Sequence, residues 1–321
     1  METTVKVRDP LIDVLKGFAI ILVVIGHASL WFSGDNRTNP LYVTIYAFHM
    51  PLFMFLSGYV SFNKRREINL GRRFRVLVIP FFVWFFISVA YHGYIFDIDK
   101  IFFYLSKLIY EPTRGMWFLW LLFWECFLLY IALKINKNHH LWIMIGLWGI
   151  LIFTHRITGT HRPYYGLPEL CWYSIYFILG YVVHLYYSKV IKTLRSIGWC
   201  NLVLFPCLLF WEIDENMYFL YSIRLYLLAF TGITASYILW EWLCHWDSKA
   251  KKILAYLGGI SLEIYVTHYY FRFITTYIEA YISNNLYLNI LLFTIFTIIG
   301  CDITQRLIKN IEWLRKILYG R

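Results

Sequence analysis

Charged residues are scarce in this sequence, and their scarcity excludes an ordinary soluble fold. Of the 321 residues, 15% are Asp, Glu, Lys or Arg, whereas 60% are hydrophobic. Soluble domains usually contain about 25% charged residues, so a protein interior alone cannot bury this much apolar surface. No polar stretch is long enough to form a second, soluble domain. We therefore predict an all-α polytopic membrane helix bundle, with a single integral membrane domain over residues 1–321.

Cysteine is also sparse, and its spacing excludes a zinc ribbon or a dithiol redox motif. The sequence contains six cysteines and no Cys-x-x-Cys pair, which those motifs require. Most of the cysteines lie within apolar runs, which favours free thiols that serve as small apolar residues. No internal repeat is present, and the first apolar run lacks a clear signal-peptide cleavage site. That run is therefore predicted to be a retained helix.

About ten membrane spans are predicted, because the long apolar runs approach the roughly 20 residues that a spanning helix needs. The run at 200–211 is the shortest, and the polar breaks 97–115 and 155–168 are interpreted as loops. The predicted spans are residues 12–32, 41–62, 76–96, 116–134, 141–155, 169–187, 200–211, 217–243, 258–279 and 286–307.

The net charge of +11 is explained by membrane topology. When the N-terminus is placed inside the cell, most of the 30 Lys and Arg residues fall in cytoplasmic segments, as the positive-inside rule requires. Both termini and the loop 63–75 are therefore predicted to be cytoplasmic. The basic excess orients the protein, so no nucleic-acid partner is expected.

Ionisable residues within the spans are the first candidates for a functional site. A charge at the bilayer centre costs about 2.5 to 3.5 kcal/mol, and such residues tend to face a cavity. Asp13, Lys16 and His27 interrupt the first span. Lys16 and His27 are eleven residues apart, which is close to three helical turns, so they share one face about 16 Å apart.

Two further histidines and a glutamate suggest a polar interior. A single buried histidine is ordinarily a core residue with satisfied hydrogen bonds. Here His49 lies in the second predicted span, and Glu263 and His268 lie in the ninth. Histidine is the usual general base near neutral pH, which makes a transfer reaction plausible. Three histidines on separate helices, without a carboxylate ligand motif, are not expected to hold a metal.

An arginine pair ends the basic loop that follows the second span. Arg72 and Arg75 are three residues apart at a predicted helix start, and guanidinium groups match phosphate oxygens geometrically. A phosphorylated cytoplasmic cofactor is one interpretation of this pair. Simple membrane anchoring by basic residues is the other, and the sequence leaves both open.

Several motifs combine into one pattern that covers most of the chain. They are Ile12-Asp13-x-x-Lys16-Gly17 followed by His27, Phe48-His49-Met50-Pro51-Leu52-Phe53 with Ser57-Gly58, Arg72-x-x-Arg75 before Pro80, Trp117-Phe118-Leu119, Leu179-Gly180-Tyr181, and Ser261-Leu262-Glu263-Ile264-Tyr265 with His268. Together they resemble the acyltransferase-3 family of integral membrane sugar O-acyltransferases. The resemblance implies ten spans in the inner (cytoplasmic) membrane of a bacterium.

The resemblance also implies a donor, an acceptor and the essential residues. The donor substrate would be acyl-CoA, commonly acetyl-CoA, with no permanently bound cofactor, and the acceptor a glycan or lipid-linked sugar hydroxyl. The family's essential histidine would be His27, and its donor-binding pair Arg72 and Arg75. The remaining partners would be membrane lipids, and a homodimer stays open.

This sequence departs from many family members at two positions. Lys16 stands where many have Arg, and Lys lacks the planar guanidinium fork. Many also have a Glu five residues after the Trp of the fourth span, where this chain has Leu122 and its nearest carboxylate is Glu125. Both variants look like the short branch similar to fucose and exopolysaccharide O-acetylases. No appended extracytoplasmic domain is expected, so any acyl hand-off would need a separate protein.

The predicted chemistry assigns a role to each catalytic candidate. A thioester is already activated, so the site must deprotonate a sugar hydroxyl and stabilise a tetrahedral oxyanion. His27 is the candidate base, and His49 either orients it or donates to the oxyanion. Asp13 or Glu263 is a candidate for fixing the tautomer. Direct transfer and an acyl-histidine intermediate both remain open.

Donor and acceptor contacts are assigned to the other polar groups. Lys16, together with the arginine pair, is a candidate for holding the phosphates of coenzyme A. Trp117, Arg224, His268 and Arg272 are candidates for contacting the acceptor. For the two arginines within spans, an intramembrane ion pair with Glu241 or Glu263 is an equal alternative.

Two other classes of function are weighed against an enzyme. A transporter or flippase of a lipid-linked glycan also uses histidine and arginine within the membrane, although secondary transporters usually show repeat symmetry that this sequence lacks. A structural or sensory subunit of an envelope complex would leave the buried polar groups unexplained.

Overall fold

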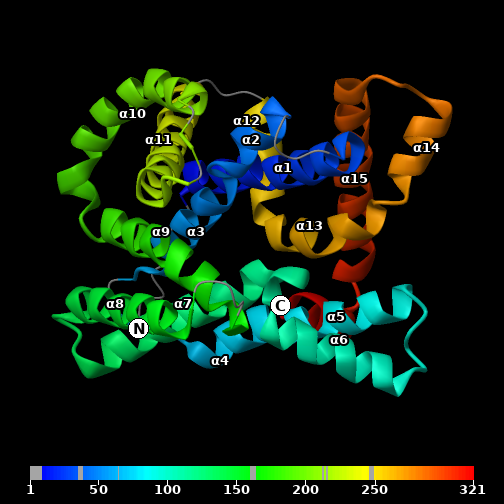
Figure 1. Cartoon of the computed structure of the whole chain (residues 1–321), viewed down its shortest axis with the longest axis horizontal. Coiled ribbons are helices and arrows are strands. Elements are labelled where there is room, and N and C mark those ends of the chain that lie inside the picture. The colour runs from blue at the N-terminus through cyan, green and yellow to red at the C-terminus, as the bar shows by residue number, and fades with distance from the viewer. Residues whose placement is uncertain are drawn as a thin grey trace. The chain divides into compact units, whose positions relative to one another are not determined.

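The computed structural model describes residues 9–34, 39–63, 65–159, 164–211, 213–214, 216–245 and 249–321, and the regular elements within these ranges are helices (Figure 1). Parts of the predicted N-terminal segment and of the loops 63–75 and 155–168 lie outside the described residues. The predicted all-α membrane bundle is confirmed.

Eight helices among the described residues are long and apolar enough to cross a membrane. They are Pro10–Ser33, Pro40–Ser61, Leu70–Tyr91, Trp117–Ile135, His140–Thr158, Tyr187–Phe210, Tyr218–Leu243 and Leu286–Lys309. The predicted span 200–211 is part of a longer helix, and 169–187 corresponds to the helix Leu167–Leu185. The six cysteines are free, as predicted.

The chain divides into two compact units, Met1–Leu56 with Ser188–Gln305 (unit 1) and Ser57–Tyr187 with Arg306–Arg321 (unit 2). The prediction of one catalytic domain across residues 1–321 stays a prediction. The elements that lie wholly or largely in unit 1 are α1 (Pro10–Ser33), α2 (Pro40–Tyr46), α3 (His49–Ser61, as far as Leu56), α10 (Tyr187–Phe210), α11 (Tyr218–Leu243), α12 (Lys249–Gly259), α13 (Ser261–Thr267), η4 (His268–Phe271), α14 (Ile274–Tyr281) and α15 (Leu286–Lys309).

Helix α1 organises unit 1 and packs along α12 (Figure 1). Asp9 caps its start by accepting a hydrogen bond from the Leu11 amide at 3.0 Å. Gly17 on α1 lies directly against the Leu254 carbonyl, and Gly258 on α12 against the Asp13 carbonyl. Without side chains at these two positions, the backbones approach more closely than any other residue allows.

The predicted span 258–279 is not one helix, because this segment is broken into short pieces. α12 ends at Gly259, and α13, the 3₁₀ turn η4 and α14 follow in succession. Consecutive glycines propagate a helix poorly, and Gly258 and Gly259 form the end of α12, where Gly258 packs against α1. The break places His268 on a tight turn instead of midway along a straight helix.

Unit 2 contains the predicted donor-binding arginines. Its elements are α4 (Leu70–Arg73), the π-helical turn η1 (Phe74–Val78), α5 (Ile79–Tyr91), α6 (Ile98–Tyr110), η2 (Pro112–Arg114), α7 (Trp117–Ile135), α8 (His140–Thr158), η3 (Tyr164–Gly166), α9 (Leu167–Leu185) and α16 (Glu312–Tyr319). Helices α7, α8 and α9 pack against one another.

The interpretation of residues 97–115 as a loop is also wrong, because most of this segment forms α6. Asp97 caps the helix by accepting from the Lys100 amide at 3.0 Å. Its apolar residues recur on one face, and Ile98 and Phe102 remain largely exposed. A short amphipathic helix of this kind is typical of a membrane interface, and its length hid it from a search for spanning runs.

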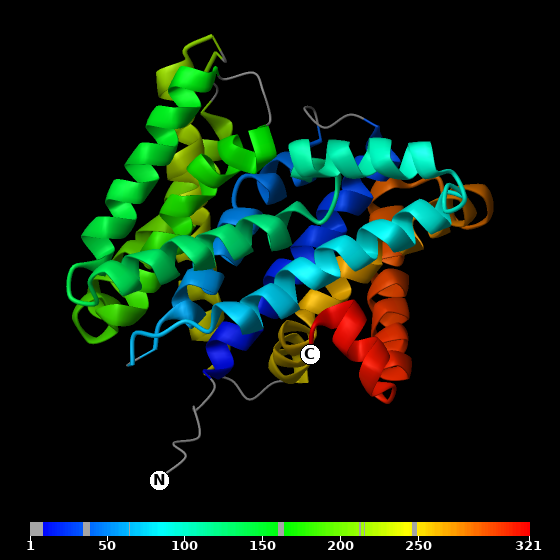
Figure 2. The same ribbon diagram turned by 90° about the horizontal axis from the view of Figure 1, so that it is seen from below.

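The C-terminal helix α16 packs against α5 within unit 2, and its end is marked C in Figure 2. The indole Nε1 of Trp84 donates to the Leu318 carbonyl at 2.8 Å. Gly320 has φ 66° and lies directly on the Arg75 carbonyl. An L-residue at position 320 would meet both an unfavourable backbone region and a steric overlap.

A labelling experiment tests the predicted topology. In a variant with Cys200, Cys207 and Cys244 replaced by serine, a cysteine introduced by Glu67→Cys should resist an impermeant thiol reagent added to sealed cells. A cysteine introduced by Asn284→Cys, in a predicted outer loop, should react. Both positions are exposed, so accessibility differs only by membrane side. Labelling at position 67 from outside would show that the orientation in the membrane is the reverse of the predicted one.

Candidate functional site

Three histidines that the sequence singles out come together in unit 1. His27 lies on α1, His49 begins α3, and His268 begins η4. The ring centroids of His27 and His268 are 5.2 Å apart, with 40° between their planes. His49 is near enough for a charge on its ring to act on His27. The histidine cluster (His27, His49 and His268) therefore forms one polar group inside unit 1.

Hydrogen bonds to backbone carbonyls set the tautomers of two of these rings. The Nδ1–H of His49 donates to the Ile45 carbonyl at 2.8 Å. The Nδ1–H of His268 donates to the carbonyls of Ile264 and Tyr265 at 3.1 and 2.8 Å. A carbonyl only accepts, so in the neutral rings Nε2 carries the lone pair.

The Nε2 atom of His268 is buried and has no hydrogen-bond partner among the described residues. Burying such an acceptor without a partner is costly, and the cost falls when a hydroxyl or a neighbouring N–H donates to it. His27 differs because the residue as a whole is only partly buried. The cluster thus combines one partly buried histidine with two that are buried and oriented by the backbone.

Trp31 completes the surroundings of His27. It lies one helical turn further along α1, and its ring stacks on His27 at 5.6 Å. The edges of Tyr269 and Phe293 pack against the indole at 5.5 and 5.4 Å. The guanidinium of Arg272 lies over it at 5.7 Å. Arg272, predicted as an acceptor contact, is thereby linked to His27 through Trp31.

Trp31 itself was not predicted as a site residue. The available signal was its position four residues after His27, which places both on one helix face. That signal is weak by itself, because tryptophans near span ends also form the ordinary aromatic belt.

The predicted carboxylates and Lys16 occupy other parts of unit 1. Asp13 is fourteen residues before His27 on the same helix, which corresponds to about 21 Å along the axis. Its buried carboxyl therefore lies at the other end of α1. Lys16 is partly exposed one turn beyond it. Glu263 is buried on α13, five residues before His268.

Arg224 serves the end of a neighbouring helix. Its Nε and Nη2 groups donate to the carbonyls of Leu208 and Leu209 at 3.2 and 3.1 Å. These carbonyls belong to the last turn of α10, where helix acceptors lack partners within the helix. Glu241, considered as an ion-pair partner for Arg224, instead binds Arg195 at 2.8 Å. The geometry thus shows a helix cap at Arg224.

The arginine pair lies in unit 2 on an unusual turn. Both Arg72 and Arg75 are exposed, and Asn69 caps α4 by accepting from the Arg72 amide at 2.8 Å. Arg75 lies within the π-helical turn η1. Pro80 explains the wide turn, because it lacks the N–H that would bind the carbonyl four residues earlier and its ring crowds that carbonyl.

Two further sequence candidates lie in unit 2. Trp117 is the first residue of α7, and its ring lies 5.2 Å from that of Tyr173. Glu125, the carboxylate nearest to the expected position at Leu122, is fully buried on the same helix. It accepts from the Ser174 hydroxyl at 2.5 Å. Among the described residues, no three His, Cys, Asp or Glu side chains are placed to hold one metal ion.

Comparison with known proteins assigns the family. Residues 9–306 match the family described as "Acyltransferase domain". The chain belongs to this acyltransferase family. The match spans nearly the whole chain and confirms the resemblance drawn from its motifs. The structure and the family together make the chain a multi-pass membrane protein of an O-acyltransferase family.

Two similar curated proteins are both called nodulation protein NolL. The protein from Mesorhizobium japonicum is 32% identical over 146 residues, which cover 43% of this chain and 39% of the relative. That from Sinorhizobium fredii is 34% identical over 122 residues, or 35% of this chain and 33% of the relative. The chain therefore covers less than two fifths of each relative's length. No solved structure matches the chain.

Proposed function

We propose that this protein transfers an acyl group, chiefly acetyl, from acyl-CoA to a hydroxyl of a cell-envelope or exported polysaccharide sugar, in the inner membrane of a bacterium. The pairing of His27 with His268 carries the proposal. The pair places a partly buried histidine, the candidate base, beside a second histidine whose Nε2 is oriented to accept a hydrogen bond. The chain that carries them belongs to an acyltransferase family.

The reaction needs one proton transfer in each direction. His27 takes the proton of the sugar hydroxyl as its oxygen attacks the thioester carbonyl carbon. The new C–O bond gives a tetrahedral oxyanion, which collapses as the C–S bond breaks. The imidazolium of His27 then returns its proton to the leaving thiolate. The N–H groups of His49 and His268 are taken by backbone carbonyls, so the positive charge on the His27 imidazolium is the group in the cluster that is suited to stabilise the oxyanion.

Trp31 and Arg272 support carbohydrate as the acceptor. An indole offers a flat apolar face to the C–H groups of a sugar ring, and a guanidinium offers several hydrogen-bond donors to its hydroxyls. Trp31 stacks on His27 and Arg272 lies over Trp31, so a sugar bound against the indole would have a hydroxyl near the base.

Donor binding is assigned to the arginine pair. Replacing Arg72 and Arg75 together with alanine should weaken acyl-CoA affinity at least tenfold, or about 1.4 kcal/mol, because two exposed guanidinium groups that pair with phosphate are lost. Titration of the purified protein in nanodiscs with CoA measures this. The control replaces Lys192 and Lys309, two exposed cations on α10 and α15, with alanine. Equal CoA affinity in both double variants would contradict donor binding by the arginines and would favour membrane anchoring as their role.

The decisive test of function is transfer of radiolabelled acetyl from acetyl-CoA by the protein in nanodiscs. Polysaccharides and lipid-linked sugars serve as acceptors, and label should appear on the carbohydrate as an alkali-labile ester. Translocation of a lipid-linked sugar in proteoliposomes without any acetyl transfer would instead identify a flippase.

A further inference from the structure

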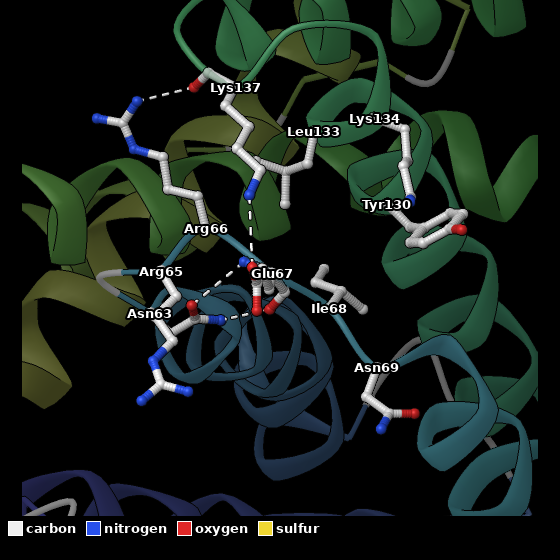
Figure 3. Close-up of a pocket in the computed structure, with 10 residues that line it drawn as sticks. All are labelled: Asn63, Arg65, Arg66, Glu67, Ile68, Asn69, Tyr130, Leu133, Lys134 and Lys137. Carbon is white, nitrogen blue, oxygen red and sulfur yellow. Dashed lines mark hydrogen bonds and ion pairs between the residues drawn. The ribbon is translucent and has the colours of Figure 1, made fainter. Parts of the chain in front are cut away.

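Unit 2 contains a pocket of about 580 Å³ that the roles assigned above leave unused (Figure 3). Its volume lies within the roughly 300 to 1,000 Å³ typical of small-molecule sites. One wall is the loop that precedes α4, and the other is the C-terminal end of α7. The charged or aromatic residues that line it are Arg65, Arg66, Glu67, Tyr130, Lys134 and Lys137.

Local bonds join Asn63 and Glu67 in the loop wall. The side-chain Nδ2 of Asn63 donates to the Glu67 carbonyl at 2.5 Å, and the backbone N–H of Glu67 donates to the Asn63 Oδ1 at 3.2 Å. Arg66 has φ 52°, which is unfavourable for a residue with a side chain. Its guanidinium donates to the Lys137 carbonyl at 2.8 Å, as Figure 3 shows. The loop is thereby fastened to the end of α7.

The charge of this pocket is strongly positive. Among the described residues that line it, four side chains are cationic and one is a carboxylate, and Lys137 pairs with that carboxylate, Glu67, at 3.5 Å. Lys134 lies near the Tyr130 ring, with 5.7 Å between its ammonium and the ring centroid. Arg65 and Lys134 have no acidic partner among the described residues. A ligand with several negative charges would supply the missing partners.

Coenzyme A needs more positive charge than an arginine pair provides. Its diphosphate and its 3′-phosphate together carry about four negative charges near neutral pH, because an isolated phosphate monoester carries about −1.5 to −2. Arg72 and Arg75 supply two positive charges. The pocket is adjacent in the chain to this pair, since Asn69 lines the pocket and also caps the turn that carries Arg72.

We propose that this basic pocket binds the 3′-phosphorylated adenosine diphosphate end of the acyl-CoA donor. The inference rests on the proposed function and extends it to Arg65 and Lys134, which act as phosphate ligands. Arg66 holds the loop to α7 and is therefore a structural member of the pocket. The nucleotide end of the donor, rather than its acyl end, supplies most of the binding charge.

Calorimetric titration with CoA and with 3′-dephospho-CoA tests the assignment. The variant joins Arg65→Gln with Lys134→Gln, and Lys192→Gln with Lys309→Gln is the matched control for lost positive charge. Wild type and control should bind CoA at least tenfold more tightly than 3′-dephospho-CoA. The pocket variant should bind CoA at least tenfold more weakly than wild type and should discriminate little between the two ligands.

The outcomes separate this inference from the proposed function. CoA binding by the wild type with no loss in the pocket variant would overturn the pocket assignment alone. No CoA binding by the wild type would overturn the donor and the pocket together. Nanodiscs of zwitterionic lipid, with and without phosphatidylglycerol, distinguish the source of phosphate. Displacement of CoA by the anionic lipid, lost in the pocket variant, would assign the pocket to a lipid headgroup.

Discussion

A His27→Gln protein is expected to insert and to bind acyl-CoA normally, yet to lose acyl transfer by about 10²-fold to 10⁴-fold, the usual contribution of a positioned base. Glutamine keeps hydrogen-bonding groups at this position but cannot take up the hydroxyl proton. Initial rates of acetyl transfer, measured beside CoA affinity, separate chemistry from donor binding. His27→Ala should lose as much activity, because the missing function is proton transfer rather than packing.

His268→Gln is the matched comparison for His27→Gln. His268 has a fixed tautomer with a free Nε2 lone pair, so it is the strongest rival for the role of base. Under our assignment this variant is impaired less than His27→Gln. Near-normal transfer by His27→Gln, together with a severe loss in His268→Gln, would exchange the two roles. Equal CoA affinity in all the variants is required for either conclusion.

Gly17→Ala should strongly destabilise the protein, although it adds one methyl group. An added Cβ would overlap the Leu254 carbonyl, and backbone cannot rotate away as a side chain can. Overpacking typically costs about 1 to 3 kcal/mol, occasionally more, and here α1 and α12 would have to separate. The midpoint of thermal unfolding in detergent is expected to fall clearly, with Gly258→Ala showing the same effect.

Gly149→Ala is a control that should not destabilise the protein. Gly149 lies within α8, and apart from the backbone of its own helix and its chain neighbours no heavy atom lies within 4 Å of an added Cβ. Alanine there should be neutral or stabilising by up to about 1 kcal/mol, since glycine is the poorer helix former. If Gly17→Ala melted at the wild-type temperature, α1 and α12 would not depend on this backbone contact.

The class of fold follows from the sequence because lipid imposes long apolar runs that can be read directly. The breaks within those runs depend on tertiary contacts and are harder to predict. Residues 258–279 read as one continuous span, yet Gly258 packs against α1 and the chain turns beyond it. Helix α6 was missed for the opposite reason, since an amphipathic helix lying at an interface needs no spanning run.

The sequence singled out the three residues of the histidine cluster, but it could not predict that they lie close together. His27, His49 and His268 each stood out as polar groups within apolar runs. Their proximity joins elements more than two hundred residues apart, which no local periodicity encodes. The basic pocket was not predicted, because the positive-inside rule already accounts for basic residues such as Arg65 and Lys134 in cytoplasmic segments. Only the fold shows that α7 brings Lys134 beside the loop.

The contact of Gly320 with Arg75 has a consequence for biosynthesis. The turn η1 is made early during synthesis, but Gly320, which packs on it, and Leu318, which accepts from Trp84 of α5, are among the last residues of this sequence to be made. A nascent chain that stops before Leu318 therefore carries Arg75 on a turn without its partner. If the proposed donor site is right, we expect ribosome-bound intermediates to bind CoA weakly until translation has passed Gly320.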